Sequence, residues 1–259
     1  MHEPGERRAR FIMATIENVV ITAGGRIDGA FAARAGTNLK ALVAVRGVTL
    51  LASAIAAARA AGASRIAVIG DDEIRRACRS DVDAIIADTG SGGGNVRAAL
   101  RAWPQDEPLL YLTSDMPYIS AAHLSDLLSR TDDETMALPL ASHAAYSRRF
   151  PSAPRAGVRL RSGTFVNGGV FVLPAGTSAR LESVASRFFE ARKSPLRMAR
   201  LVGLPFLFAF LTRRLDISAL EARAEAVLGV RARAVVDAAP ELGFDIDDVE
   251  HYDYACENE

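Results

Sequence analysis

The chain has 259 residues, of which 49% are hydrophobic and 24% are charged, and its formal net charge is +0. This composition is typical of a globular α/β or similar protein with a sizeable core, and it excludes a disordered or fibrous chain. The neutral balance gives no support for a nucleic-acid partner, because such partners require a basic surface.

Strands and helices alternate along the chain up to residue 140. Short apolar or β-branched runs predict strands at residues 19–22, 65–70, 84–87, 109–113, 136–140 and 166–173, the last interrupted by Gly168-Gly169. Periodic segments, many rich in alanine, predict helices at residues 50–61, 72–79, 95–103 and 121–130. This alternation predicts an α/β fold: a mainly parallel, Rossmann-like sheet with helices on both faces.

The N-terminal residues and the two cysteines bear on the expected domain organisation and cellular location. Residues 1–12 lack the apolar stretch of a secretory signal, and we expect a disordered extension or an upstream start before Met13. Residues 13–259 are expected to form a single domain with an irregular helical insertion around 175–235. Cys78 and Cys256 do not have metal-ligand spacing, which predicts free thiols and a cytoplasmic location.

The first loop that could bind a ligand follows the first predicted strand. It reads Ala23-Gly24-Gly25-Arg26 and continues to Lys40. Glycines let backbone N–H groups approach phosphate oxygens, and Arg26 and Lys40 carry the positive charge that a triphosphate requires. The alternative is a tight turn with two exposed cations.

Two acidic segments form a second group of candidates. Asp115 follows the strand at 109–113, and the carboxyl end of a parallel strand is a usual place for a Mg²⁺ ligand. Asp245 and Asp247 are two residues apart, so in an extended segment they point the same way. The alternatives are a turn-capping Asp115 and a solvated acidic stretch near the C-terminus.

Two glycine-rich segments are weaker candidates. Residues 89–95 end in Gly93-Gly94-Asn95, which suits a loop against a base or a phosphate, or else a flexible linker with Asn95 as the helix N-cap. Asn167-Gly168-Gly169 offers an amide to a ligand, or else forms a bulge or turn.

In their order along the chain, these segments resemble the MobA-like branch of the NTP-transferase family, which has a GT-A-type fold. The resemblance rests on four motifs: Ala23-Gly24-Gly25-Arg26 with Lys40, Leu112-Thr113-Ser114-Asp115-Met116-Pro117, Asn167-Gly168-Gly169-Val170-Phe171 and Phe244-Asp245-Ile246-Asp247-Asp248-Val249-Glu250. The sequence departs from the family pattern in having Ser114 in place of glycine and a longer spacing from Gly25 to Lys40.

The resemblance implies a Mg²⁺-dependent nucleotidyltransferase that moves a nucleoside monophosphate from an NTP to a small phosphorylated acceptor and releases pyrophosphate. It implies catalytic roles for Arg26, Lys40 and Asp115. The nucleotide-binding residues it implies are Ala23, Gly24, Gly25, Arg26, Lys40, Gly93, Gly94 and Asn95. The metal ligands it implies are Asp115, Asp245 and Asp247, and the acceptor-binding residues are Asn167, Gly168 and Lys193.

Residues 188–215 have no counterpart in these motifs. They combine cations, among them Lys193 and Arg197, with the longest apolar run of the chain at 201–211, which is far shorter than the ~20 residues that span a bilayer. The composition favours a core helix with snorkelling cations. The alternative is an acceptor-binding lid whose apolar face meets a hydrophobic acceptor, a partner subunit or, peripherally, a membrane surface.

Two other functions stay open at this point. A GT-A-type glycosyltransferase would use a sugar nucleotide, but such enzymes usually carry the paired aspartates in mid-chain and lack the glycine-rich loop with a lysine. A non-catalytic nucleotide-binding module would tolerate the loss of Lys40 or Asp115, whereas both positions are filled.

Overall fold

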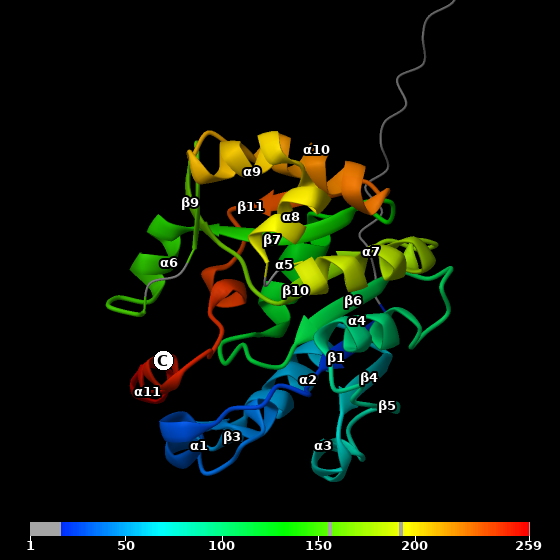
Figure 1. Cartoon of the computed structure of the whole chain (residues 1–259). Helices are drawn as coiled ribbons and strands as arrows, with labels where there is room; N and C mark the ends of the chain where they lie inside the picture. The colour runs from blue at the N-terminus through cyan, green and yellow to red at the C-terminus, as the bar shows by residue number, and fades with distance from the viewer. Residues whose placement is uncertain (1–16, 155–156, 192–193, 259) are drawn as a thin grey trace, which may run out of the picture.

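The computed structural model describes residues 17–154, 157–191 and 194–258. Nine strands form one sheet in the order β5-β4-β1-β6-β10-β7-β9-β8, with β11 paired to β7 (Figure 1). The strands are β1 (Asn18–Thr22), β4 (Arg65–Gly70), β5 (Ala84–Ala87), β6 (Leu109–Thr113), β7 (Met136–Ser142), β8 (Val158–Leu160), β9 (Gly163–Val166), β10 (Val170–Leu173) and β11 (Ala232–Val236). A separate hairpin joins β2 (Ala44–Val45) to β3 (Val48–Thr49).

The sheet is mixed but mostly parallel. β5, β4, β1 and β6 pair in parallel, as do β7 and β11, whereas β10 runs antiparallel to both β6 and β7, and β9 runs antiparallel to β7. The predicted strand at 166–173 is split into β9 and β10, and the interruption at Gly168-Gly169 is confirmed. The predicted α/β fold with a mainly parallel sheet is therefore confirmed.

Helices cover both faces because strand side chains alternate between them. Val19 and Ile21 of β1 pack with α2 (Leu50–Ala60) and α5 (Ala121–Ser129), while Val20 packs with α4 (Gly92–Leu100) and α7 (Ser178–Ala191). The remaining helices are α1 (Gly29–Ala35), α3 (Asp72–Cys78), α6 (His143–Arg149), α8 (Pro195–Val202), α9 (Leu204–Leu211), α10 (Ile217–Leu228) and α11 (Val249–Glu257), with short 3₁₀ turns η1 (Lys40–Leu42) and η2 (Pro240–Gly243).

Two helices differ from their predictions. α4 begins at Gly92 and not at Asn95, because the Ser91 hydroxyl accepts a hydrogen bond from the N–H of Gly94 and caps the helix. The core helix predicted over 188–215 is wrong, because the described part of this segment is divided among the end of α7, α8 and α9, and α9 has no buried residue. The extension predicted at 1–12 lies outside the described residues. In the part of the chain that the structure describes, every helix is too short or too polar to cross a membrane.

Candidate active site

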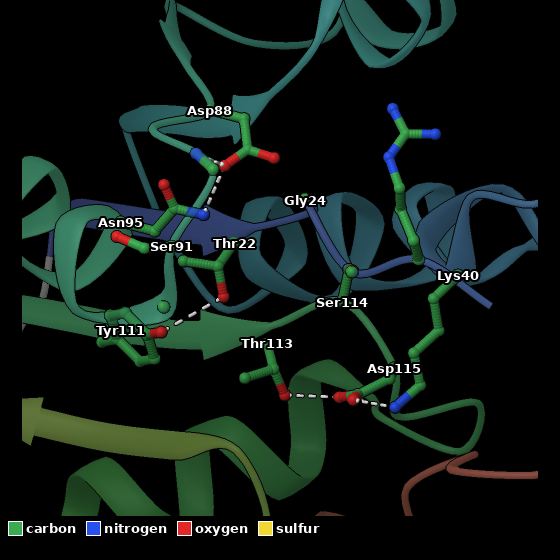
Figure 2. Close-up of a pocket in the computed structure, with 14 residues that line it drawn as sticks. Thr22, Gly24, Lys40, Asp88, Ser91, Asn95, Tyr111, Thr113, Ser114 and Asp115 are labelled. Carbon is green, nitrogen blue, oxygen red and sulfur yellow. Dashed lines mark hydrogen bonds and ion pairs between the residues drawn. The ribbon is translucent and has the colours of Figure 1, made fainter. Parts of the chain in front are cut away.

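A pocket of about 650 Å³ opens at the carboxyl ends of β1, β5 and β6 (Figure 2). Ligands bind at this edge of open α/β sheets, since loops from adjacent parallel strands converge there. The predicted site residues that line the pocket are Gly24, Gly25, Arg26, Lys40, Asn95 and Asp115. The structure thus brings the glycine-rich loop, the lysine and the first aspartate together.

The long segment between Gly25 and Lys40 closes on itself. The N–H of Lys40 donates to the carbonyl of Gly25 at 2.9 Å, the N–H of Ile27 donates to the carbonyl of Asn38 at 3.0 Å, and Arg26 forms a bridge with Leu39. The helix α1 lies in the chain segment between Ile27 and Asn38. The extra length is therefore accommodated outside the pocket, and Lys40 lies beside Gly25.

The Lys40 ammonium lies between two carboxylates. Its Nζ is 2.6 Å from Oδ2 of Asp115 and 2.8 Å from Oδ1 of Asp247. Burial disfavours the charged lysine, but the charge of Asp115 and the hydrogen bonds to Asp115 and Asp247 outweigh it, so the pKa of Lys40 is raised. Lys40 is therefore a permanent cation at neutral pH.

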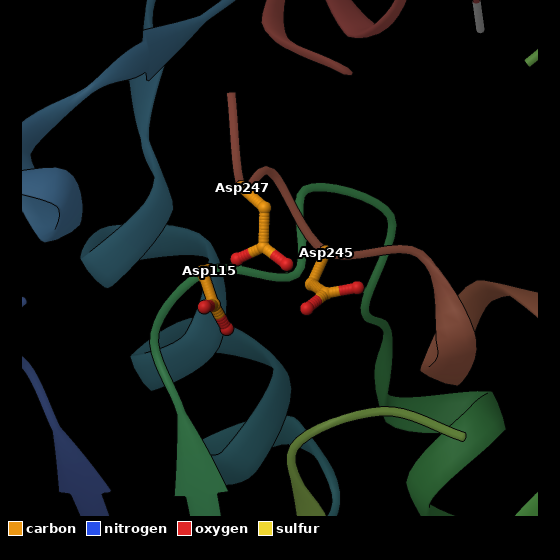
Figure 3. Close-up of side chains that lie close together, drawn as sticks. All are labelled: Asp115, Asp245 and Asp247. Atoms are coloured by element: carbon orange, nitrogen blue, oxygen red, sulfur yellow. The ribbon is translucent and has the colours of Figure 1, made fainter. Parts of the chain in front are cut away.

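Asp115, Asp245 and Asp247 form a cluster in which one oxygen of each lies within 4.8 Å of the others (Figure 3). The buried side chains of Phe244 and Ile246 alternate with Asp245 and Asp247, as predicted for an extended segment. The N–H of Ile246 donates to the carbonyl of Asp115 at 3.0 Å, which ties the C-terminal segment to the loop after β6. The cluster is thus held by backbone and core contacts.

The cluster concentrates negative charge in a partly buried place. Burial, followed by the charges of Asp247 and Asp115, raises the pKa of Asp245 to about 6. Burial also opposes ionisation of Asp247, but the hydrogen bond and charge of Lys40 outweigh it and lower the pKa of that carboxyl. Oxygen ligands in this number and spacing suit a hard divalent cation such as Mg²⁺.

Asp245→Asn is expected to stabilise the metal-free protein near neutral pH. The native state binds the Asp245 proton more tightly than the unfolded chain does, since its pKa rises from 3.8 to about 6. The wild type therefore loses stability as pH rises between these values, and the variant does not. In the presence of a chelator, chemical denaturation should give the variant a free energy of unfolding about 1–3 kcal/mol larger than that of the wild type above pH 6. This difference should disappear near pH 4.

Asp248→Asn is the matched control for that experiment. Burial opposes ionisation of Asp248, but hydrogen bonds from His251 outweigh it and lower the pKa of the carboxyl. Its ionised form thus stabilises the fold, and this variant should lose stability at neutral pH. Equal stability of wild type and Asp245→Asn across the pH range would contradict the account of the cluster.

The loop after β5 forms the opposite wall of the pocket. Oδ1 of Asp88 accepts hydrogen bonds from the N–H of Gly90 at 2.9 Å and from Nδ2 of Asn95 at 2.8 Å, and Oδ1 of Asn95 accepts from the N–H of Thr89 at 2.9 Å. These bonds make the loop an ordered wall rather than a flexible linker. Asn95 lines the pocket, but its amide is engaged in holding the loop (Figure 2).

Three predicted residues, Ala23, Gly93 and Gly94, do not line the pocket, and a fourth, Arg26, lines it while paired to another side chain. Ala23 is buried in the core, and its N–H donates to the carbonyl of Ile69 at 2.8 Å. Gly93 and Gly94 are in the first turn of α4 and do not line the pocket; a Cβ on Gly94 would lie 2.1 Å from Oγ1 of Thr89. Arg26 lines the rim, and its guanidinium pairs with Asp71 at 2.7 Å.

The segment Asn167-Gly168-Gly169 is shaped by close packing. A Cβ on Gly168 would lie 1.6 Å from the carbonyl oxygen of Leu242, and one on Gly169 would lie 1.8 Å from Oγ1 of Thr113. Both positions therefore require glycine for structural reasons. Asn167 is exposed and does not line the pocket, while Lys193 lies outside the described residues.

The structure adds two pocket residues that sequence reasoning missed, Asp88 and Tyr111, and it also places Thr22, Gly90, Ser91 and Thr113 in the pocket, which lay within the candidate segments without a role of their own. Asp88 follows a predicted parallel strand directly, so the rule that selected Asp115 also selects it. The sequence did not indicate Tyr111, because this residue lies within an apolar strand that is predicted to belong to the core. Its hydroxyl lies 3.2 Å from Oγ1 of Thr22.

Comparison with known proteins connects this geometry to a family. The family model described as MobA-like NTP transferase domain matches residues 19–148. A solved structure from Thermus thermophilus, described as a hypothetical transferase, is 32% identical with a TM-score of 0.81, and the match covers 92% of this chain and 99% of that chain. A search of curated protein sequences found no match.

Two more distant structures share the fold. The 2-C-methyl-D-erythritol 4-phosphate cytidylyltransferase from Thermus thermophilus is 16% identical with a TM-score of 0.54, with 93% of this chain and 96% of that chain covered. The CTP:phosphocholine cytidylyltransferase from Streptococcus pneumoniae is 12% identical with a TM-score of 0.55, with 93% and 97% covered.

Proposed function

Since the chain belongs to the MobA-like NTP transferase family of enzymes, we propose that it moves a nucleoside monophosphate from an NTP to a small phosphorylated acceptor in a Mg²⁺-dependent reaction. The observation that carries this proposal is the contact of Lys40 with Asp115 and Asp247 beside the pocket. A cation and a carboxylate cluster next to a glycine-rich loop are the groups that phosphoryl chemistry requires.

The triphosphate would lie along the glycine-rich loop. Gly24 and Gly25 expose backbone without side chains at the pocket, and Lys40 lies beside Gly25. Arg26 supplies a second cation once its guanidinium leaves Asp71, which is feasible because its side chain is 59% exposed. The ordered loop of Asp88 and Asn95 would then face the base.

Asp115, Asp245 and Asp247 would hold the Mg²⁺ ion, with their carboxylate oxygens as ligands. They fit this role, because three acids share one small space and a protein cation already bridges two of them. When bound, Mg²⁺ neutralises charge on the phosphate oxygens and favours departure of pyrophosphate. Lys40 would then turn from the carboxylates towards the phosphates.

The proposed reaction needs no protein nucleophile. An oxygen of the acceptor phosphate attacks the α-phosphorus, the bond from that phosphorus to the bridging oxygen of the β-phosphate breaks, and pyrophosphate leaves. Lys40 and Arg26 stabilise the charge on the transferred and leaving groups. The two distant cytidylyltransferases are named for phosphorylated acceptors, which supports an acceptor of this class. Asn167, Gly168 and Lys193 remain our candidates for contact with it.

Gly24→Ala is expected to lower turnover by about 10²-fold or more, whereas Gly25→Ala should have little effect. A Cβ on Gly24 would lie 2.5 Å from Oδ2 of Asp88, and the other oxygen of that carboxylate, Oδ1, accepts hydrogen bonds from Gly90 and Asn95, so relief of the clash must displace either the glycine-rich loop or this bonded wall of the pocket. A Cβ on Gly25 would meet Lys40 at 3.5 Å, an ordinary contact. Steady-state kinetics of the two variants test this; equal losses would contradict it.

Labelled nucleotides test the proposed function directly. With a panel of phosphorylated sugars and alcohols, label from the α-phosphate of the NTP should join the acceptor, and label from the γ-phosphate should leave as pyrophosphate. Chelation of Mg²⁺ should stop both. Transfer of the γ-label to the acceptor, or transfer only from a sugar nucleotide, would contradict the proposal and, in the second case, favour the glycosyltransferase. A cytoplasmic location stays a prediction.

A further inference from the structure

The helix α9 is apolar on every side, yet it is not buried. It reads Leu204-Pro-Phe-Leu-Phe-Ala-Phe-Leu211 and contains no charged or polar residue. It packs against α8 at one edge of the molecule (Figure 1). A helix that is apolar all round is normally covered by protein or by lipid.

The two faces of α9 have different environments. Phe206 and Ala209 pack against the cluster formed by Leu140, Leu160, Phe165 and Leu215. Leu204, Phe208 and Leu211 are spaced i, i+4 and i+7, so they share the opposite face, and they are 69%, 63% and 70% exposed. The outward face thus places three large apolar side chains in water.

The chain segment that contains α9 carries only positive charge, although the whole chain is neutral. Residues 191–215 contain no Asp or Glu. Arg197 and Arg200 before α9 and Arg213 and Arg214 after it are exposed, and no ion pair within the described ranges involves them. The first acid that follows, Asp216, pairs with Arg161 at 2.8 Å. In the sequence, the exposed apolar helix is therefore flanked at both ends by exposed arginines that have no ion-pair partner among the described residues.

We propose that α9 and its four flanking arginines, the α9 surface, dock the protein on an anionic lipid bilayer. Eight residues form a helix of about 12 Å, which is too short to span the ~30 Å hydrocarbon core but suits an interfacial helix lying in the headgroup region. Arginines beside such a helix pair with anionic headgroups. This inference is independent of the proposed function.

Charge complementarity favours lipid over a second copy of the chain. A two-fold dimer through the α9 surface would place the same patch on both sides of the interface. The arginines of one copy would then face those of the other, and the described part of this surface offers no acid to pair with them. An anionic bilayer supplies that charge and also covers the apolar face.

Co-sedimentation with vesicles tests the proposal. The wild type should bind vesicles of phosphatidylcholine with about 30% phosphatidylserine, bind pure phosphatidylcholine weakly, and be released by salt. Phe208→Ser with Leu211→Ser should lower the partition coefficient by about tenfold or more. Arg197→Gln with Arg200→Gln should lower it by about fivefold for each charge removed.

Matched variants separate this surface from general effects. Val48→Ser removes an apolar side chain that is 50% exposed on the β2–β3 hairpin, and Arg76→Gln with Arg79→Gln removes two exposed charges at α3. Both should bind vesicles like the wild type, and all variants should keep the wild-type melting temperature within a few degrees. Absence of vesicle binding, equal effects of α9 and control variants, or a concentration-dependent dimer that Phe208→Ser dissociates would overturn the proposal.

Discussion

Asp115→Ala is expected to lower turnover by about 10³-fold or more while the fold is retained. Asp115 contributes to the carboxylate cluster and contacts Lys40, and its other oxygen accepts a hydrogen bond from Oγ1 of Thr113 at 2.5 Å. None of these contacts belongs to the hydrophobic core. Turnover with saturating NTP, measured beside the melting temperature, separates loss of chemistry from loss of structure.

Asp248→Ala is the control for that variant. Asp248 lies in the same acidic segment, but its Oδ1 accepts from the N–H of His251 at 3.0 Å and caps α11. This variant should lose about 1 kcal/mol of stability and keep its turnover. If Asp115→Ala kept full activity in a folded protein, Asp115 would have no part in the reaction.

Lys40→Met is expected to have two opposite effects. Loss of the ammonium should slow turnover by about 10²-fold, because in the proposed function this charge would face the phosphates. It should also raise the affinity for Mg²⁺ in the absence of nucleotide by about tenfold, because Lys40 competes for the oxygens of Asp115 and Asp247. Calorimetric titration with Mg²⁺ alone, beside kinetics, measures both.

Arg34→Met controls for the loss of one cation. Arg34 pairs with Asp253 at 3.0 Å outside the pocket, and its side chain is 63% exposed. Its removal should leave both Mg²⁺ affinity and turnover near wild type. Weaker Mg²⁺ binding in Lys40→Met would mean that the lysine supports the cation site and does not occupy it.

Much of the fold could be predicted because its core strands are short apolar runs with clear ends. The strands of the parallel half, such as β1 and β6, lie where predicted, and their alternating side chains place helices on both faces. The core helix predicted over 188–215 was wrong because hydrophobicity alone does not distinguish a helix covered by protein from one left exposed, as α9 is. The start of α4 was misplaced because Ser91 offered a better cap than Asn95.

Part of the candidate site could be predicted from the sequence for a similar reason. Residues at strand ends, such as Asp115, follow from topology, and the alternation of Phe244 and Ile246 with Asp245 and Asp247 indicated their common direction. Contacts between segments far apart in the chain could not be predicted from the sequence. The bridge of Lys40 between Asp115 and Asp247 and the close approach of Gly168 to Leu242 depend on tertiary packing.

The most direct test of the central claim is the thermal stability of the protein with ATP, CTP, GTP and UTP, each with and without Mg²⁺. Binding to the native state raises the melting temperature by mass action. We expect one NTP to raise it by about 5 °C or more at about 100-fold its Kd, only with Mg²⁺, and not in Asp115→Ala. The account would be contradicted if only a sugar nucleotide raised the melting temperature, or if an NTP raised it equally without Mg²⁺ and in Asp115→Ala.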